Sequence, residues 1–209
     1  MLRDEELIPG RYFEDMWMSR PDVDWLYVSI NRSGSSFTRT YLLNNGFDKV
    51  DPRDNRSTHK LVILREPLDR LMSGVSFWKF GKQFIRNPQR FLTEYEFDHH
   101  IKLQTKFLID VDLDTCTFMK YGSSLKSNLI QFVAEQKTTM LHEPGHWENR
   151  ITPINTPDGE DMVEPDSESG IRFQIYNAMK DGGKLYETVM TYLEEDYKLY
   201  NSVKFYGTN

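Results

Sequence analysis

The sequence predicts an α/β fold, in which a single compact domain holds a mainly parallel sheet flanked by helices. Two short runs of buried character, residues 25–30 and 61–64, are each followed by a segment whose apolar residues keep helical spacing. Strands that alternate with helices in this way are typical of a parallel sheet. The chain has 209 residues, 38% of them hydrophobic, which fits one domain spanning residues 1–209 with a sizeable core.

Each predicted element follows from local chemistry. The run at 25–30 is rich in β-branched and aromatic residues, and the polar residues of 31–36 end it. Pro67 suits the first turn of a helix, because it needs no backbone N–H there. In chain order, the predicted elements are a strand at 25–30, a helix at 37–43, a strand at 61–64, a helix from Pro67 to Gly81, a strand at 115–119, a helix at 125–133 and two C-terminal helices, the last built on apolar residues between Leu185 and Tyr197.

The segment at about 142–165 breaks this alternation. It is rich in Pro, Gly, Asn and Asp and has little periodicity. Long loops inside compact domains are either disordered excursions or functional lids. We expect this loop to close over a bound ligand.

Charge is distributed unevenly. The net charge is −6, yet residues 31–90 hold twelve Lys and Arg against five Asp and Glu, a local balance of +7. The negative net charge argues against a nucleic-acid binder. The excess of positive charge in residues 31–90 favours a small anionic ligand.

The sequence also predicts a cytoplasmic protein with no membrane segment. No apolar run approaches the ~20 residues of a membrane helix. The acidic N-terminus lacks the apolar core of a signal peptide. The single cysteine, Cys116, fits a reducing compartment.

The first candidate site is the polar loop after the strand at 25–30. A strand, a small loop and a helix that begins inside the loop form an anion site, because unpaired N–H groups converge at the helix start. Gly34 allows close backbone approach, Ser33, Ser35 and Ser36 add hydroxyl groups, and Arg32 adds a positive charge. The Gly-Lys pair of the nucleoside triphosphate loop is absent.

A second candidate site follows the strand at 61–64. Arg65 leaves that strand at its C-terminal end, where ligands bind in open α/β sheets. Ser73 lies about two turns into the next helix. We expect it on the face near Arg65. The alternative is that Arg65 pairs with Glu66 or Asp69 as surface charge.

These segments resemble the sulfotransferase superfamily, and more narrowly its carbohydrate sulfotransferase branch. Residues 26–37 are similar to the 5′-phosphosulfate loop, and residues 62–74 are similar to the 3′-phosphate motif. His100 to Leu108, Asn155-Thr156 and the residues from Glu195 to Tyr200 resemble later segments, in the right order. In the first loop Asn31-Arg32 stands where the family usually has proline and lysine. Arginine keeps the charge.

The resemblance implies a phosphate-loop-like sulfotransferase core that uses PAPS (3′-phosphoadenosine-5′-phosphosulfate) and releases PAP, without a metal. Arg32 would stabilise the transferring group and the leaving oxygen. Residues 33–37, from Ser33 to Phe37, would bind the phosphosulfate, and Arg65 and Ser73 would hold the 3′-phosphate. The branch favours a carbohydrate acceptor, with a peptide tyrosine, a lipid or a small metabolite as alternatives.

A hydroxyl acceptor also needs a general base. His100 is the first candidate, with Gln104 expected one helical turn further on the same face. A buried structural role for His100 is an equal alternative, and Asp51 and Asp54 are the next candidates. His59 precedes the strand at 61–64 and is interpreted as structural.

Two other functions stay open, a small-molecule or nucleoside kinase and a non-catalytic nucleotide-binding module. A kinase is disfavoured because the chain lacks the Gly-Lys-Ser/Thr motif and a clear carboxylate to hold Mg²⁺. The run from His142 to His146 fits the H-E-x-x-H zinc pattern, but Pro144 and Gly145 interrupt the helix that this pattern needs. No metal site is therefore predicted.

Overall fold

A computed structural model describes residues 17–51, 59–96, 98–145 and 166–207. The chain divides into two compact units, each built from separate segments. The sheet unit comprises Met1–Leu64, Asp110–Trp147 and Lys204–Asn209, and the helical unit comprises Arg65–Ile109 and Glu148–Val203.

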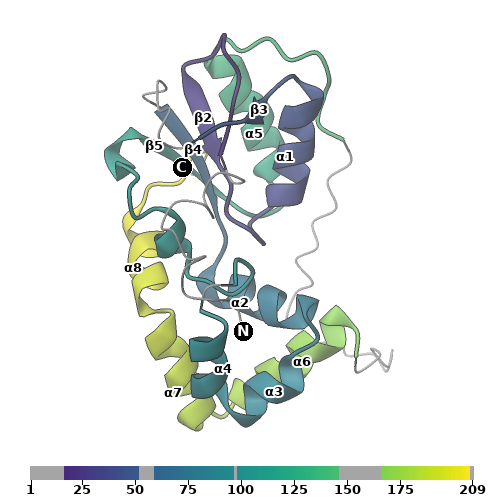
Figure 1. The fold of residues 1–209 in the computed structure, drawn as a ribbon, viewed down its shortest axis with the longest axis vertical. Helices are drawn as coiled ribbons and strands as arrows, with labels where there is room; N and C mark the ends of the chain where they lie inside the picture. The colour runs from purple at the N-terminus through teal and green to yellow at the C-terminus, as the bar shows by residue number, and fades with distance from the viewer. Residues whose placement is uncertain (1–16, 52–58, 97, 146–165, 208–209) are drawn as a thin grey trace. The chain divides into compact units, whose positions relative to one another are not determined.

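The sheet unit contains a mixed five-stranded sheet with the order β3-β1-β2-β4-β5 (Figure 1). Strands β2, β4 and β5 are parallel, whereas β1 runs antiparallel to both β2 and β3. The prediction of a mainly parallel sheet thus holds for the centre and one edge. The elements of this unit are β1 (Trp17–Ser19), β2 (Trp25–Val28), α1 (Ser35–Asn44), β3 (Asp48–Lys49), β4 (His59–Leu64), η3 (Leu113–Thr115), β5 (Cys116–Lys120) and α5 (Leu125–Glu135).

Strands β1 and β3 were not predicted, because three and two residues are too short for a pattern to emerge. The strands at 25–30, 61–64 and 115–119 are confirmed, although β2 ends two residues earlier than predicted. The register pairs Trp25 with His59 and Val28 with Val62. The chain therefore leaves β2 and β4 at the same edge of the sheet, the edge where α/β proteins bind ligands.

Helix α5 covers one face of the sheet. The Trp25 ring lies 5.2 Å from the ring of Phe132 in α5 and 4.9 Å from that of Phe47. His59, at the start of β4, also stacks on Phe132 at 6.1 Å, and its Nε2 lies 2.8 Å from Thr117 Oγ1. These contacts agree with a structural role for His59, at the opposite end of β4 from Leu64.

The helical unit packs its helices around a separate apolar core. Its elements are α2 (Pro67–Phe77), α3 (Gly81–Arg86), α4 (Pro88–Glu94), η2 (Gln104–Phe107), α6 (Glu168–Met179), α7 (Gly183–Tyr192) and α8 (Glu194–Ser202). The prediction of two C-terminal helices is wrong, because the chain turns at Leu193 and separates α7 from α8. The core consists mainly of Leu71, Met72, Val75, Phe84, Phe91, Ile101, Ile171, Ile175 and Val189.

Within the described ranges, no helix combines the length and the apolar character that crossing a membrane requires.

Candidate functional site

The loop after β2 has an unusual backbone. The buried residues Ser29 and Ile30 follow β2, and a turn over residues 31–34 then leads into α1. Arg32 has φ 66° and Gly34 has φ 79°, so both adopt the left-handed conformation. That conformation is uncommon for a side chain such as arginine. Backbone conformations of this kind cluster at sites that bind ligands.

Helix α1 begins inside this loop with Gly34 as its N-cap. No side chain caps the helix start, and its first turn contains no acidic residue. The N–H groups of residues 35–37 therefore lack intrahelical acceptors at the positive end of the helix dipole. Ser33 and Ser35 are buried, whereas Ser36 is exposed. The chain thus places the predicted loop residues from Ser33 to Phe37 at one helix start, a kind of position that favours anions in proteins generally.

Three buried hydroxyl groups lie close to this loop, and the sequence analysis missed them. They belong to Tyr27 in β2, to Ser29 and to Thr38 in α1, and all three residues are fully buried. Burial raises the pKa of Tyr27 to about 12, and the neighbouring hydroxyls of Ser29 and Thr38 partly offset that rise. None of the three hydroxyls makes a direct hydrogen bond of ordinary geometry to another described residue. Buried hydroxyls of this kind usually bind ordered water.

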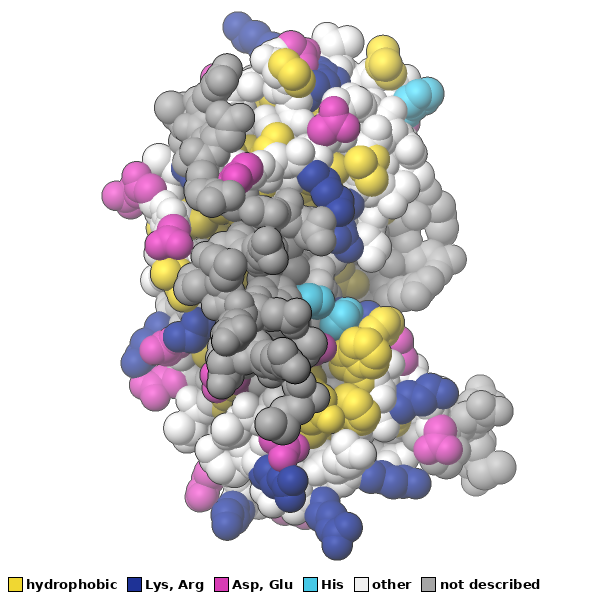
Figure 2. All heavy atoms as spheres, viewed as in Figure 1, with side chains coloured by type: hydrophobic (Ala, Val, Ile, Leu, Met, Phe, Trp, Pro, Cys, Tyr) yellow, Lys and Arg dark blue, Asp and Glu magenta, His cyan; other side chains and the backbone are white. Residues whose placement is uncertain are grey.

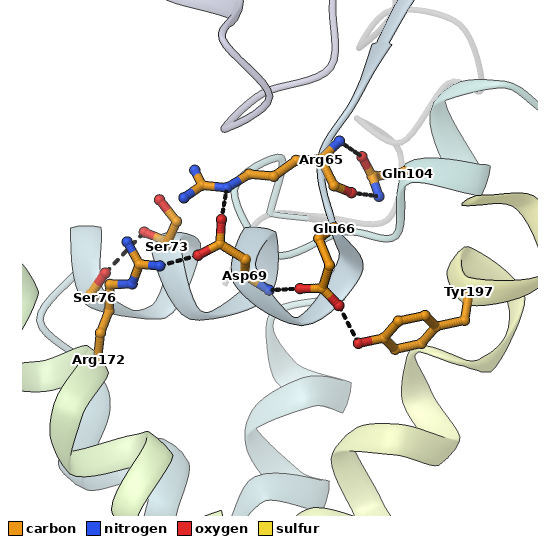
Figure 3. A network of polar contacts seen from close by, with 8 residues as sticks. All are labelled: Arg65, Glu66, Asp69, Ser73, Ser76, Gln104, Arg172 and Tyr197. Carbon is orange, nitrogen blue, oxygen red and sulfur yellow. Dashed lines mark hydrogen bonds and ion pairs between the residues drawn. The ribbon is translucent and has the colours of Figure 1, made fainter. Parts of the chain in front are cut away.

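Arg65 follows β4 directly and is held firmly within the helical unit (Figure 3). Its guanidinium Nε donates to Asp69 Oδ2 at 2.5 Å, and the other oxygen of Asp69 accepts from Arg172 in α6. Arg65 and Arg172 are only 4% and 8% exposed. The side chain of Arg65 is therefore part of a buried cluster, not an exposed surface pair.

The backbone of Arg65 is equally constrained. The Gln104 amide accepts from the Arg65 N–H at 3.0 Å and donates to the Arg65 carbonyl at 2.9 Å. Asp196 in α8 then accepts from the N–H groups of Gln104 and Thr105, at 2.8 and 2.9 Å. These contacts give Gln104 and Asp196, from two of the resembling segments, a clear role in fixing the position of Arg65.

Helix α2 begins with Glu66 as its N-cap. The Glu66 carboxylate accepts from the Asp69 N–H at 2.6 Å and also from the Tyr197 hydroxyl. Burial, and secondly the hydrogen bond to the Glu66 carboxylate, raise the pKa of Tyr197. The cap fixes the first turn of α2, and with it the direction of Asp69.

Ser73 lies one helical turn after Asp69 and is 4% exposed. Figure 3 shows its side chain on the same side of α2 as the guanidinium of Arg65. The structure thus brings Arg65 and Ser73 together, as expected from the sequence.

His100 lies in a different environment from the one predicted. Residues 99–101 form a turn, and η2 begins only at Gln104, so His100 and Gln104 do not share a helix face. The His100 ring stacks on Phe77 at 4.7 Å and meets Trp78 edge-on at 5.3 Å. Phe77 and Trp78 are each 42% exposed. Figure 2 shows histidine side chains beside an apolar patch on this face.

Asp98 orients the ring of His100. His100 Nδ1 lies 3.2 Å from Asp98 Oδ1, and the same oxygen accepts from the His100 N–H at 2.8 Å and from Trp78 Nε1 at 3.3 Å. Burial acts to raise the pKa of Asp98, but these hydrogen bonds outweigh it and the pKa lies below the usual value. An ionised Asp98 favours the tautomer with the proton on Nδ1, which leaves the lone pair on Nε2. In that tautomer Nε2 is able to accept a proton.

Helix α2 also fixes the segment that carries His100. Arg70 donates to the carbonyls of Lys102 and His99, at 2.6 and 3.1 Å. Gly74 approaches so closely that a Cβ atom there would lie 2.1 Å from the His100 carbonyl oxygen. Positions 70, 74 and 77 share one helix face, which binds the His100 segment.

Several residues that were predicted for the site lie elsewhere in the fold or outside the described residues. Asp51, one of the next candidates for the base, is half-buried and follows β3 by two residues in the sheet unit. Asp54, His146 and the pair Asn155-Thr156 lie outside the described residues, as does the expected lid from residue 146 to 165. Among the described side chains, no three His, Cys, Asp or Glu residues group as metal ligands do.

Asp98 and Arg172 were missed by the sequence analysis. Asp69 was expected only as a possible surface partner of Arg65, and the structure confirms the pair but buries it. Arg172 had no signal in the sequence, because 103 residues separate it from Asp69.

Comparison with models of known protein families, with curated proteins and with solved structures found no match.

Proposed function

We propose that this protein is a PAPS-dependent sulfotransferase, which moves a sulfuryl group from PAPS to a hydroxyl or amine of an acceptor. One observation carries the proposal. The neighbouring parallel strands β2 and β4 leave the sheet at the same edge, and each leads into a segment suited to an anion. The first is the start of α1 with its left-handed Arg32 and Gly34, and the second contains the buried Arg65 and Ser73. The ordered resemblance to sulfotransferase motifs supports the same function.

In this mechanism the acceptor oxygen attacks sulfur in line, and the bond from sulfur to the bridging phosphate oxygen breaks. PAP leaves with the electron pair of that bond. Charge grows on the bridging oxygen, where Arg32 and the N–H groups of residues 35–37 would stabilise it. No residue needs to form a covalent bond, so positioning and charge supply most of the rate, as in phosphoryl transfer.

His100 is our proposed general base. Its Nε2 would take the acceptor proton while Asp98 stabilises the resulting imidazolium. A carbohydrate is the acceptor class that we propose, because the resemblance is to that branch. The exposed rings of Phe77 and Trp78 beside His100 agree with this class, since apolar aromatic faces pack well against sugar rings.

The test is release of PAP from PAPS in the presence of an acceptor panel of sulfatable oligosaccharides, tyrosine peptides and simple alcohols. Arg32→Ala should abolish turnover while weakening PAP binding less, because the Arg32 charge acts mainly on the transition state. Arg90→Gln is the control, since Arg90 is an exposed residue paired with Glu94. Near-normal turnover in Arg32→Ala would contradict the role of Arg32. Turnover of ATP with Mg²⁺ in place of PAPS would favour the kinase.

A further inference from the structure

Two arginines from distant parts of the chain converge on one carboxylate in the helical unit. Asp69 Oδ2 accepts from Arg65, and Asp69 Oδ1 accepts from Arg172. The three side chains are only 5%, 9% and 13% exposed for Arg65, Arg172 and Asp69. Asp69 thus holds two guanidinium groups side by side, although their charges repel each other.

The cluster of Arg65, Arg172 and Asp69 keeps a net positive charge, since two guanidiniums face one carboxylate, and that charge attracts a phosphate monoester. Such a group carries about −1.5 to −2 at pH 7 and has three acceptor oxygens. A planar guanidinium binds such a group through hydrogen bonds to its oxygens, so two neighbouring guanidiniums can contact one phosphate from two directions. Asp69 meets Arg65 at Nε, and Figure 3 shows the terminal nitrogens of Arg65 on the side of Ser73.

Arg172 is also fixed independently of any ligand. It lies in α6, and the neighbouring Ile171 and Ile175 belong to the buried core that α6 shares with α2. Its position beside Arg65 is therefore set by helix packing, and binding would require little further ordering of the side chain.

We propose that Arg172 is a third side chain of the 3′-phosphate site and binds the phosphate together with Arg65 and Ser73. This inference rests on the proposed function, because that function supplies the 3′-phosphate. It adds a specificity-determining residue that the sequence motifs do not contain. Arg172 should distinguish PAP from a nucleotide that lacks the 3′-phosphate.

The experiment is calorimetric titration of the full chain with PAP, with 5′-AMP and with inorganic phosphate. The proteins are wild type, Arg172→Gln and the control Arg90→Gln, whose arginine makes an exposed pair with Glu94. Arg172→Gln should raise the Kd for PAP at least about 30-fold, as expected for loss of a buried charged partner. The Kd for 5′-AMP should change by less than about fivefold, the range of an exposed pair. For Arg90→Gln, the Kd values for PAP and for 5′-AMP should also change by less than about fivefold.

Arg172→Gln leaves Asp69 with fewer partners, so folding is checked by circular dichroism. If that variant does not fold, the same titrations are made with Arg172→Lys. Lysine keeps the charge but loses the planar fork of the guanidinium. A selective loss of PAP affinity in Arg172→Lys supports phosphate binding. Wild-type affinity for PAP in either folded variant overturns the inference, and so does an equal loss for PAP and 5′-AMP.

The wild-type titrations separate this inference from the proposed function. If wild type prefers PAP and the Arg172 variant retains that preference, the inference fails and the sulfotransferase proposal stands. If wild type binds PAP no better than 5′-AMP, but binds inorganic phosphate in a way that Arg172→Gln abolishes, the donor assignment fails and the two-arginine anion site stands. If wild type binds neither PAP nor phosphate, both are overturned.

Discussion

Arg65 combines a buried side chain with a backbone held on both sides by Gln104. We expect Arg65→Ala to weaken PAP binding by on the order of 2–5 kcal/mol, because a buried charge partner of the phosphate is lost. Binding of 5′-AMP should scarcely change. Calorimetric titration of both nucleotides measures the difference, and similar losses for the two would mean that Arg65 does not bind the 3′-phosphate.

Cys116 is the one cysteine of the chain, at the start of β5. Burial raises the pKa of its thiol to about 11, although the charge of Lys60 partly opposes this rise. A raised pKa keeps the thiol protonated, so at pH 8 only about one molecule in a thousand carries the reactive thiolate.

The alkylation rate of native Cys116 by iodoacetamide should therefore be slow at pH 8 and should still rise about tenfold per pH unit up to pH 10. A free cysteine peptide, with an ordinary pKa of about 8.5, is the control and should level off above about pH 9.5. A rate for the protein that levels off with the peptide would contradict the effect of burial.

Substitutions at His100 and at Asp98 should lower kcat by different amounts if His100 is the general base and Asp98 orients it. His100→Gln should lower kcat by on the order of 10²- to 10⁴-fold, the usual contribution of a general base. Asp98→Asn should lower kcat less, because the ring remains while its preferred tautomer is lost. Both variants should bind PAP as wild type does. Unchanged kcat in His100→Gln would assign the ring a structural role in its stack on Phe77.

Helix α2 makes two separate sets of contacts on adjacent faces. Asp69 and Ser73 lie on the face toward Arg65, whereas Arg70, Gly74 and Phe77 contact the His100 segment. Helical spacing explains the division, because residues three and four apart share a face. The single helix therefore links the proposed phosphate site to the proposed base.

A substitution at Gly74 tests the contact between α2 and the His100 segment. A Cβ atom at position 74 would meet the backbone oxygen of His100 at 2.1 Å, where neither partner can move away cheaply. Gly74→Ala should cost about 1–3 kcal/mol of stability, as overpacking usually does, and should lower kcat by displacing His100. Gly122→Ala is the control, since a Cβ there meets nothing within 4 Å. Chemical denaturation measures the change. Equal stability of the two variants would show that the His100 segment is free to shift.

For the whole molecule, ligand selectivity should appear in thermal stability. PAP at about 100 times its Kd should stabilise the folded chain by about 2.7 kcal/mol. For a chain of this size that free energy corresponds to roughly 5–10 °C in Tm. ATP with Mg²⁺ and Zn²⁺ should give much smaller shifts. A larger shift with ATP and Mg²⁺ than with PAP would favour the kinase alternative over the sulfotransferase.

Local sequence patterns were enough to predict the strands β2, β4 and β5, the helices α1, α2 and α5, and the two polar junctions that follow β2 and β4. Those features depend on side chains within about ten residues of one another, whose periodicity, turn residues and proline positions are visible in the chain. The placement of Ser73 on the same side of α2 as the Arg65 side chain could be predicted for the same reason, since one strand end and two helical turns join them.

The partners that come from distant parts of the chain could not be predicted in this way. Arg172 reaches Asp69 across 103 positions of sequence, and Asp196 reaches Gln104 across 92. Asp98 orients His100 through a turn that replaced the expected helix. Contacts of this kind arise when helices pack their apolar faces together, and packing brings side chains together without any local pattern in the sequence. A buried charge must then find its counter-charge wherever the fold provides one, which is why two arginines share Asp69.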